Sequence, residues 1–318
     1  MKRILFFVLT AIAALILISE FRLSQTDPPP APTVIRTDCD ITFTVKTDSG
    51  TESVNMADYL PGVLAGEMPA LFESQALMAQ AVAARTYILH RMQNGSPNHP
   101  EADICNNPAC CKAYVSQTQM QKNWGTNFDT YYAKIADAAS ETDGQYLTYN
   151  GQLIEAVFHS SSAGATEASE SIWNNRAYLV SVESPETAED VPNYISQVTF
   201  STDILKQQLS TAHPSIAFTD DPCSWFSNAN RNDSGRVQSM QVCNLTLSGT
   251  QLRSALGLRS TAFDVSFADN CFTFTVTGYG HGVGMSQYGA NVFAKQGWHY
   301  ADILAHYYPN TQLTSAAG

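Results

Sequence analysis

Glu67 is the residue of this sequence best suited to acid–base chemistry. It lies in the segment GEMPA (residues 66–70), and the residues on both sides of it are mostly apolar. An apolar setting favours the protonated form of a carboxyl group, so such a glutamate can deliver a proton as a general acid. The alternative is a glutamate at a helix end that faces solvent. The proline at position 69 is expected to end the regular structure.

Arg85 is a second chemically unusual position. It interrupts the stretch ALMAQAVAARTY (residues 76–87), which is otherwise made mainly of small and apolar residues. Ala81 and Leu89 lie four residues to either side, so the arginine belongs to a helix face that should pack inward. A buried arginine is costly unless it is paired. Two interpretations remain open: an ion pair, with Glu67 as one candidate partner, or a clamp for a sugar or a carboxylate.

A glycine-rich segment, GYGHGVGMSQYGA (residues 278–290), is the third unusual stretch. It lacks the Lys-Ser/Thr ending and the βαβ setting of a phosphate-binding loop. Glycine at alternate positions permits close backbone approach and positive φ, as the wall of an active site requires. His281, Ser286, Gln287 and Tyr288 then offer hydrogen-bond donors and an aromatic ring. For His281 the alternative is a buried histidine that is satisfied by its neighbours.

His159 precedes Ser160, Ser161 and Ser162, which raises the possibility of a serine hydrolase. The GxSxG turn of such enzymes is missing from this segment, and adjacent residues of a strand point to opposite faces. The sequence therefore disfavours a Ser-His nucleophile here.

Four metal-binding side chains are concentrated in the loop NHPEADICNNPACC (residues 98–111). They are His99, Cys105, Cys110 and Cys111, a set that suits tetrahedral Zn²⁺ in a structural role, because four protein ligands leave no open position. The alternative is disulfide pairing outside the cell. Taking three cysteines as ligands leaves an even number, namely Cys39, Cys223, Cys243 and Cys271.

These segments together resemble the SpoIID/LytB family, which comprises stage II sporulation protein D and the amidase enhancer LytB. The resemblance extends from about residue 59 to residue 313. It includes weaker matches at FHSSSAGATE (158–167), AYLVSVESP (177–185), SGTQLRSALGLRSTAF (248–263) and ILAHYYPNTQL (303–313).

The resemblance implies a peptidoglycan lytic transglycosylase, with Glu67 as the catalytic acid and then base. The enzyme would cleave the MurNAc-GlcNAc bond of glycan strands, including peptide-stripped strands, and leave 1,6-anhydro-MurNAc ends, as in septum or engulfment remodelling during sporulation. The sequence shows no second acidic motif of comparable character, which fits a mechanism with one carboxylate. The alternatives are a non-catalytic amidase enhancer or wall-glycan-binding protein and, more weakly, a zinc hydrolase.

The family also implies roles for other residues. Arg85 would bind substrate, His159 and Ser160 would line the groove, and Tyr178 would bind glycan. Val180 departs from the family pattern, because the sporulation enzyme carries lysine there. Some clostridial relatives hold zinc with two histidines and two cysteines, so Cys110 would replace one histidine.

The pattern of elements predicts an α+β fold, in which a mostly helical catalytic part is combined with a β-rich part. Expected elements are a strand near residues 39–47, helices over 73–92 and 127–140, a hairpin turning at Asn150-Gly151, a short helix over 251–256 and a final helix over 286–296. Short strands and turns are expected between residues 195 and 274.

The N-terminal residues predict a location outside the cytosol. Lys2 and Arg3 precede an apolar run over residues 4–19, which favours an uncleaved signal anchor over a cleaved signal peptide. We therefore expect an anchor over 1–22, a proline-rich linker over 23–37 and a catalytic domain over 38–318, single-pass and extracytoplasmic. The net charge of −12 speaks against nucleic acid as a partner. Expected partners are glycan strands, the membrane and an amidase.

Overall fold

The computed structural model describes residues 37–316. The predicted anchor and nearly all of the predicted linker therefore lie outside the described residues. Within residues 37–316, none of the helices is both long enough and apolar enough to cross a membrane. Residues Ile35–Gly318 form one unit, which mixes helices with several small sheets, so the predicted α+β class is confirmed.

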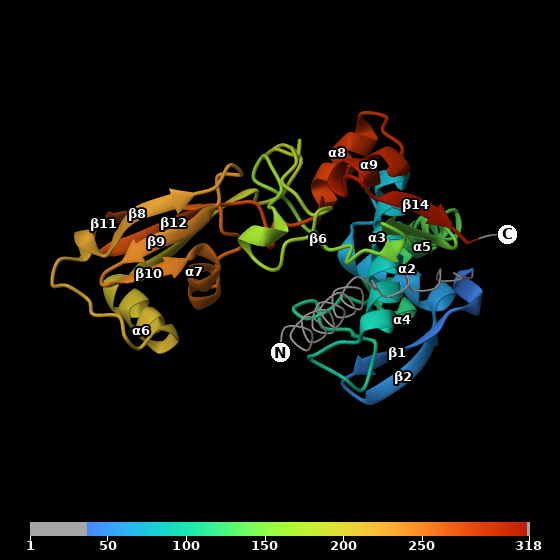
Figure 1. The fold of residues 1–318 in the computed structure, drawn as a ribbon, viewed down its shortest axis with the longest axis horizontal. Coiled ribbons are helices and arrows are strands. Elements are labelled where there is room, and N and C mark those ends of the chain that lie inside the picture. The colour runs from blue at the N-terminus through green and yellow to red at the C-terminus, as the bar shows by residue number, and fades with distance from the viewer. Residues whose placement is uncertain (1–36, 317–318) are drawn as a thin grey trace, which may run out of the picture. The chain divides into compact units, whose positions relative to one another are not determined.

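Helix α3 is the centre of the helical part (Figure 1). It runs over Ser74–Asn94 and is buried along most of its length, because its many alanines let neighbouring helices approach from several sides. The helices in contact with it are α2 (Met56–Glu67), α5 (Phe128–Ser140), α8 (Gln287–Lys295) and α9 (Tyr300–Tyr307). The segments that contribute to this core are thus more than two hundred residues apart in the sequence.

Two small sheets flank the helices. Strand β1 (Thr42–Thr47) pairs antiparallel with β2 (Gly50–Asn55) and parallel with β3 (Ile104–Cys105). Strand β4 (Gln145–Tyr149) lies between β5 (Gln152–Leu153) and β14 (Gln312–Ser315). The predicted turn at Asn150-Gly151 is confirmed: both residues have positive φ, 51° and 76°, as a two-residue hairpin turn requires.

The β-rich part has a core of its own (Figure 1). This core combines aliphatic side chains with a group of aromatic rings, in which Phe272 contacts the Trp225 ring face to face and the Phe226 ring edge-on. One three-stranded sheet of this part consists of β7 (Ile195–Ser201), β12 (Cys271–Thr277) and β11 (Phe263–Ala268). The other consists of β8 (Phe226–Arg231), β9 (Val237–Val242) and β10 (Leu245–Ser248). Two helices, α6 (Thr202–Ala212) and α7 (Gly249–Leu256), complete this part.

A short parallel pair connects the glycine-rich segment with the strand that carries His159. Strand β13 (Met285–Ser286) pairs with β6 (Phe158–His159), so Ser286 lies opposite His159. Gly284 makes this approach possible: it has φ +72°, and a Cβ there would overlap the carbonyl oxygen of Val157.

Several elements differ from the prediction. The helix over α8 is not the last one, because α9 follows it. Helices α2, α4 (Gln117–Trp124) and α6 were not predicted either. Helix α2 has apolar residues at helical spacing, but it also contains a proline and two glycines, which disfavour a helix. Helix α4 is polar and lacks the apolar periodicity that marks a helix.

Candidate active site

A cleft of about 1030 Å³ contains Glu67 and residues from both parts of the fold. Its charged lining residues are mixed in sign: Glu67 and Glu155 are acidic, whereas Arg91, Lys112, Arg176 and Arg253 are basic. Among the described residues, the lining includes His159, Ser160, His281 and Gln287 of the predicted site, but not Arg85, Tyr178, Ser286 or Tyr288.

Glu67 is the last residue of α2, and both of its carboxylate oxygens are held. The backbone N–H of Ala113 donates to Oε1 at 2.8 Å, and the side-chain amide of Gln287 donates to Oε2 at 3.2 Å. The structure corrects the prediction that the Glu67 carboxyl group has an apolar setting. The side chains of Val63 and Leu64 are buried in the core, whereas the carboxylate contacts polar groups. Glu67 therefore lies at the meeting point of three segments, the end of α2, the end of the cysteine-rich loop and the start of α8.

The start of α8 is fixed by a buried carboxylate that the sequence analysis missed. Glu186 is 2% exposed and accepts hydrogen bonds from the backbone N–H of Ser162 and the hydroxyls of Ser184 and Ser286. Ser286 is fully buried and caps α8 by accepting from Gly289 N–H. Ser286 is thus not available to substrate, which corrects the prediction; it positions Gln287, the next residue, beside Glu67.

His281 lines the cleft with a defined tautomer. Its Nδ1 accepts the backbone N–H of Val283 at 3.1 Å, so the proton of the neutral ring lies on Nε2. Burial, together with the positive charge of Lys112, lowers the pKa of His281 to about 3. The ring is therefore neutral at physiological pH.

His159 and Ser162 form a hydrogen bond of 2.8 Å between Nε2 and Oγ, which resembles a catalytic Ser-His pair. Ser162 is 0% exposed, however, and His159 Nδ1 donates to the carbonyl of Val283 at 3.2 Å. A nucleophile must reach its substrate, so the burial of Ser162 agrees with the sequence-based argument against a serine hydrolase. Ser160 lines the cleft, and its carbonyl accepts the N–H of Tyr288.

Arg85 does not reach the cleft, which corrects the prediction that it binds substrate. Its side chain is 0% exposed and makes a bidentate ion pair with Asp38, at 2.6 and 2.7 Å. The remaining donors reach the carbonyls of Ala139 and Gln145 and the hydroxyl of Thr142. The ion-pair interpretation therefore holds, with Asp38 rather than Glu67 as the partner.

Two aromatic residues of the predicted site are also placed elsewhere. Tyr178 is buried, and its hydroxyl accepts the N–H of Glu155, so it supports a cleft residue instead of binding glycan itself. Tyr288 is half-buried and packs edge-on against Phe72, with 4.9 Å between ring centroids.

Lys112 and Glu155 are cleft residues that the sequence analysis did not single out. Lys112 is 5% exposed, and its Nζ lies 4.0 Å from the Tyr87 ring centroid and 3.5 Å from that of Phe158. Burial lowers the pKa of Lys112 to about 8, against the opposing effect of Glu67. Glu155 pairs with Arg91 at 3.1 Å and Arg176 at 3.9 Å. In the sequence, the signal for Glu155 is a charged residue between two apolar ones, Ile154 and Ala156. The structure shows that both of these neighbours are buried.

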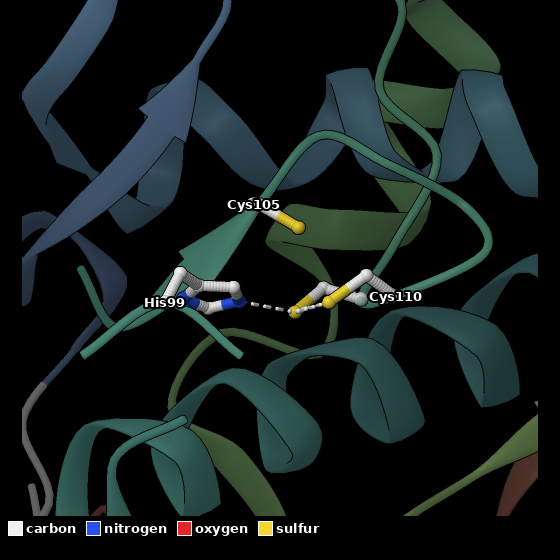
Figure 2. Close-up of side chains that lie close together, drawn as sticks. His99, Cys105 and Cys110 are labelled. Carbon is white, nitrogen blue, oxygen red and sulfur yellow. Dashed lines mark hydrogen bonds between the residues drawn. The ribbon is translucent and has the colours of Figure 1, made fainter. Parts of the chain in front are cut away.

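The four predicted metal ligands lie close together, and two of them, Cys110 and Cys111, also line the cleft. Figure 2 shows how His99, Cys105 and Cys110 are grouped. The ligand atoms of His99, Cys105, Cys110 and Cys111 all lie within 4.8 Å of one another, and all seven cysteines of the chain are free thiols. His99 Nε2 lies 3.1 Å from Cys111 Sγ, whereas its Nδ1 bonds to the carbonyl of Ala102. That second bond leaves Nε2 to face the thiols, as in histidines that bind metal.

Comparison with known proteins places the chain in a family. The model of the SpoIID family, described as stage II sporulation protein, matches residues 46–149, which include Glu67 and the cysteine-rich loop. Stage II sporulation protein D of Bacillus subtilis (strain 168) is 38% identical over 267 residues, covering 83% of this chain and 76% of that protein. The Bacillus amyloliquefaciens protein of the same name is 36% identical over the same shares.

A more distant relative carries a different name. An amidase enhancer of Bacillus subtilis is 29% identical over 315 residues, which cover 80% of this chain but only 40% of that longer protein. The chain belongs to the stage II sporulation protein D family.

Proposed function

We propose that the chain is a lytic transglycosylase that cleaves the MurNAc-GlcNAc bond of peptidoglycan strands, with Glu67 as its single acid–base residue. The observation that carries the proposal is the position of this carboxylate: it lies in a cleft large enough for sugar rings and is fixed by two donors from distant segments. The family membership supports the same assignment.

The hydrogen bonds of Glu67 suggest which of its two carboxylate oxygens transfers the proton. Oε1 is bound by the backbone N–H of Ala113, whereas Oε2 faces the longer contact from the side chain of Gln287. Oε2 would carry the proton and give it to the glycosidic oxygen, breaking the bond to C1 of the muramic sugar. The resulting carboxylate would then take the proton of the C6 hydroxyl as that oxygen bonds to C1, which closes the 1,6-anhydro ring and restores the acid.

Glu155 is the other carboxylate of the cleft, and a hydrolase would need such a second group as base or nucleophile. Two arginines already pair with it, however. Pairing with Arg91 and Arg176 favours its role as a fixed negative charge that orders the arginines. We therefore assign the chemistry to Glu67 alone.

The test compares Glu67→Gln with Glu155→Gln on purified glycan strands. Glutamine is nearly isosteric with glutamate but cannot exchange the proton, so Glu67→Gln should abolish cleavage while far-ultraviolet circular dichroism stays unchanged. Glu155→Gln should retain measurable cleavage, because it disturbs only the ordering of the arginines. Loss of cleavage in both variants to the same extent would favour a mechanism with two carboxylates.

A second candidate function is a non-catalytic amidase enhancer, or a protein that binds wall glycan and a partner amidase. The similarity to the Bacillus subtilis amidase enhancer favours it. In that case the Glu67→Gln protein would stimulate an amidase as well as the native protein does. The native protein alone, without the amidase, would form no glycan fragments.

We also propose that His99, Cys105, Cys110 and Cys111 hold a structural Zn²⁺. Tetrahedral coordination with Zn–S bonds of about 2.3 Å places ligand atoms roughly 3.5–3.8 Å apart. The spacing of up to 4.8 Å between the ligand atoms needs only small side-chain rotations to reach this geometry. The ion would fix the loop that ends at Lys112 and Ala113, and these residues would then present their donors to the cleft.

From the sequence alone, we propose a single-pass membrane protein whose catalytic part is outside the cytosol. The apolar run over residues 4–19, preceded by Lys2 and Arg3, supports this location. Labelling intact cells with a membrane-impermeant thiol reagent tests it at Cys223, which is exposed. Protection of Cys223 in intact cells, with labelling after lysis, would contradict the proposal.

A further inference from the structure

Two large aromatic side chains at the cleft remain exposed, and neither takes part in the chemistry assigned to Glu67. Trp173 is 49% exposed and Tyr279 is 45% exposed, and both line the cleft together with His281. Single exposed aromatic rings are common on protein surfaces and need no explanation. Two of them that line one cleft, from segments more than a hundred residues apart, do need one.

Trp173 is held by its neighbours although much of its surface is open. Its ring packs against His281, with 5.0 Å between ring centroids. Its backbone N–H donates to the carbonyl of Ser169, a residue that is itself 1% exposed and tied to Leu179. The indole is therefore fixed before any ligand arrives, which lowers the entropy cost of binding.

Tyr279 is held in a similar way by a different part of the fold. Its backbone exchanges two hydrogen bonds with Ser161, at 2.9 and 3.1 Å. The guanidinium of Arg259 lies 4.2 Å from the centroid of its ring. One side of the phenol is thus occupied by a cation, and close to half of the residue is left for a ligand.

The chemistry of these surfaces matches the apolar face of a pyranose ring. In β-linked sugars the axial C–H groups lie on one face and carry a slight positive charge, whereas the negative charge of an aromatic ring is concentrated on its face. Tyr and Trp further offer an O–H and an N–H to sugar hydroxyls. Rigid amphipathic rings of this kind give contact area at a low entropy cost.

We infer that Trp173 and Tyr279 form a stacking subsite for N-acetylhexosamine rings of the strand, which sets the affinity of the cleft for glycan. The inference rests on the proposed function for its choice of ligand, but it concerns binding and does not involve proton transfer. The arginines of the cleft would contact polar substituents, while these two rings would contact the sugar faces.

The fluorescence of Trp173 gives a direct measurement. The chain has four tryptophans, and Trp173 is the exposed one, since Trp225 is buried and Trp124 and Trp298 are partly buried. Titrating the Glu67→Gln protein with tetra-N-acetylchitotetraose should change the emission intensity and wavelength. The Trp298→Phe variant is the matched control, because that indole stacks on Phe293 outside the cleft lining and its loss should leave the change intact.

Calorimetry with the same oligosaccharide then distinguishes the loss of an aromatic ring from a disturbance of the fold. Trp173→Ala and Tyr279→Ala should each raise Kd roughly tenfold, the size expected for one lost stacking contact. Trp173→Phe and Tyr279→Phe should retain most of the affinity, because they keep a ring, and the melting temperatures of all four should stay close to that of the parent.

Two results would overturn the inference: no binding of the oligosaccharide by the Glu67→Gln protein, or a Kd within twofold of the parent in both alanine variants. Binding is measured without the catalytic acid, so its outcome does not depend on whether Glu67 cleaves the strand. If the native protein produces anhydro ends but oligosaccharide binding does not depend on Trp173 and Tyr279, only the subsite proposal is contradicted. If binding depends on both rings but the protein never cleaves strands, only the proposed transglycosylase activity is contradicted.

Discussion

At the scale of single residues, the cleft depends on groups that hold Glu67 without reacting. Ala113 and Gln287 contact its two oxygens, and Glu186 fixes the helix start that carries Gln287. Buried polar groups of this kind are costly unless they are satisfied. Their pairing explains why residues from three separate segments of the chain remain in one arrangement.

Arg85 gives the clearest prediction at this scale. Because Arg85 and Asp38 are both almost completely buried, removing either partner leaves an uncompensated charge in the core. Arg85→Met and Asp38→Asn should each lower the free energy of unfolding by about 3–5 kcal/mol, measured by urea denaturation. The double variant should lose less than the sum, because the two changes remove one shared interaction. An Arg85→Met protein with native stability but weakened oligosaccharide binding would restore the substrate-binding role.

The sequence pointed to Glu67 and to the four metal-binding side chains as candidates, and the fold brings Glu67 to the cleft and the four side chains together. It did not point to the partner of Arg85. A motif shows which residue types are close in the chain, whereas Asp38 lies 47 residues before its partner in an unremarkable segment. The same limit explains why Lys112 and Glu155 were missed: only the fold shows that their side chains reach the cleft. Conversely, Ser286 was predicted from its donor chemistry, but in the structure its hydroxyl donates to the buried carboxylate of Glu186 and accepts the N–H of Gly289 as the cap of α8.

At the scale of elements, the cysteine-rich loop links a cluster of metal-binding side chains to the cleft. Cys110 and Cys111 line the cleft, and the next two residues carry the ammonium of Lys112 and the N–H that binds Glu67. Apart from the two-residue strand β3, this loop has no regular secondary structure, and it contributes only a few buried side chains to the core. A bound ion would supply the missing stability.

Elemental analysis of the purified protein should therefore give about one Zn²⁺ per chain. Cys105→Ser should lower both the zinc content and the melting temperature, because the ion would stabilise the folded loop more than the unfolded one. Cys223→Ser is the matched control, since that thiol is exposed and lies outside the cluster. A metal-free protein with Cys105, Cys110 or Cys111 in disulfides would contradict the zinc proposal.

The pairing of β13 with β6 gives a second prediction for an element. Gly284 and Gly297 both have positive φ, but only at Gly284 would an added Cβ overlap another backbone atom. Gly297→Ala should cost about 1 kcal/mol of stability from backbone strain alone. Gly284→Ala should cost clearly more and should also disturb the position of Gln287 beside Glu67. Equal unfolding free energies for the two variants would show that the strand pairing adapts without penalty.

At the scale of the whole molecule, the fold has two hydrophobic cores, one in the helical part and one in the β-rich part. Residues from both parts line the same cleft. The net charge of −12 does not describe this cleft, where four basic side chains face two acidic ones. The local sequence predicted the long helices α3 and α5 and the hairpin at Asn150-Gly151. It could not predict how the sheets assemble, because sheet order depends on contacts between distant strands.

The central claim is that one carboxylate cleaves the strand without adding water, and the products test it directly. Purified glycan strands are digested in water enriched in heavy oxygen, and the fragments are analysed by mass spectrometry. If Glu67 acts first as acid and then as base toward the C6 hydroxyl, the new muramic ends are 1,6-anhydro sugars and carry no heavy oxygen. New reducing ends that contain heavy oxygen would show hydrolysis and contradict the account.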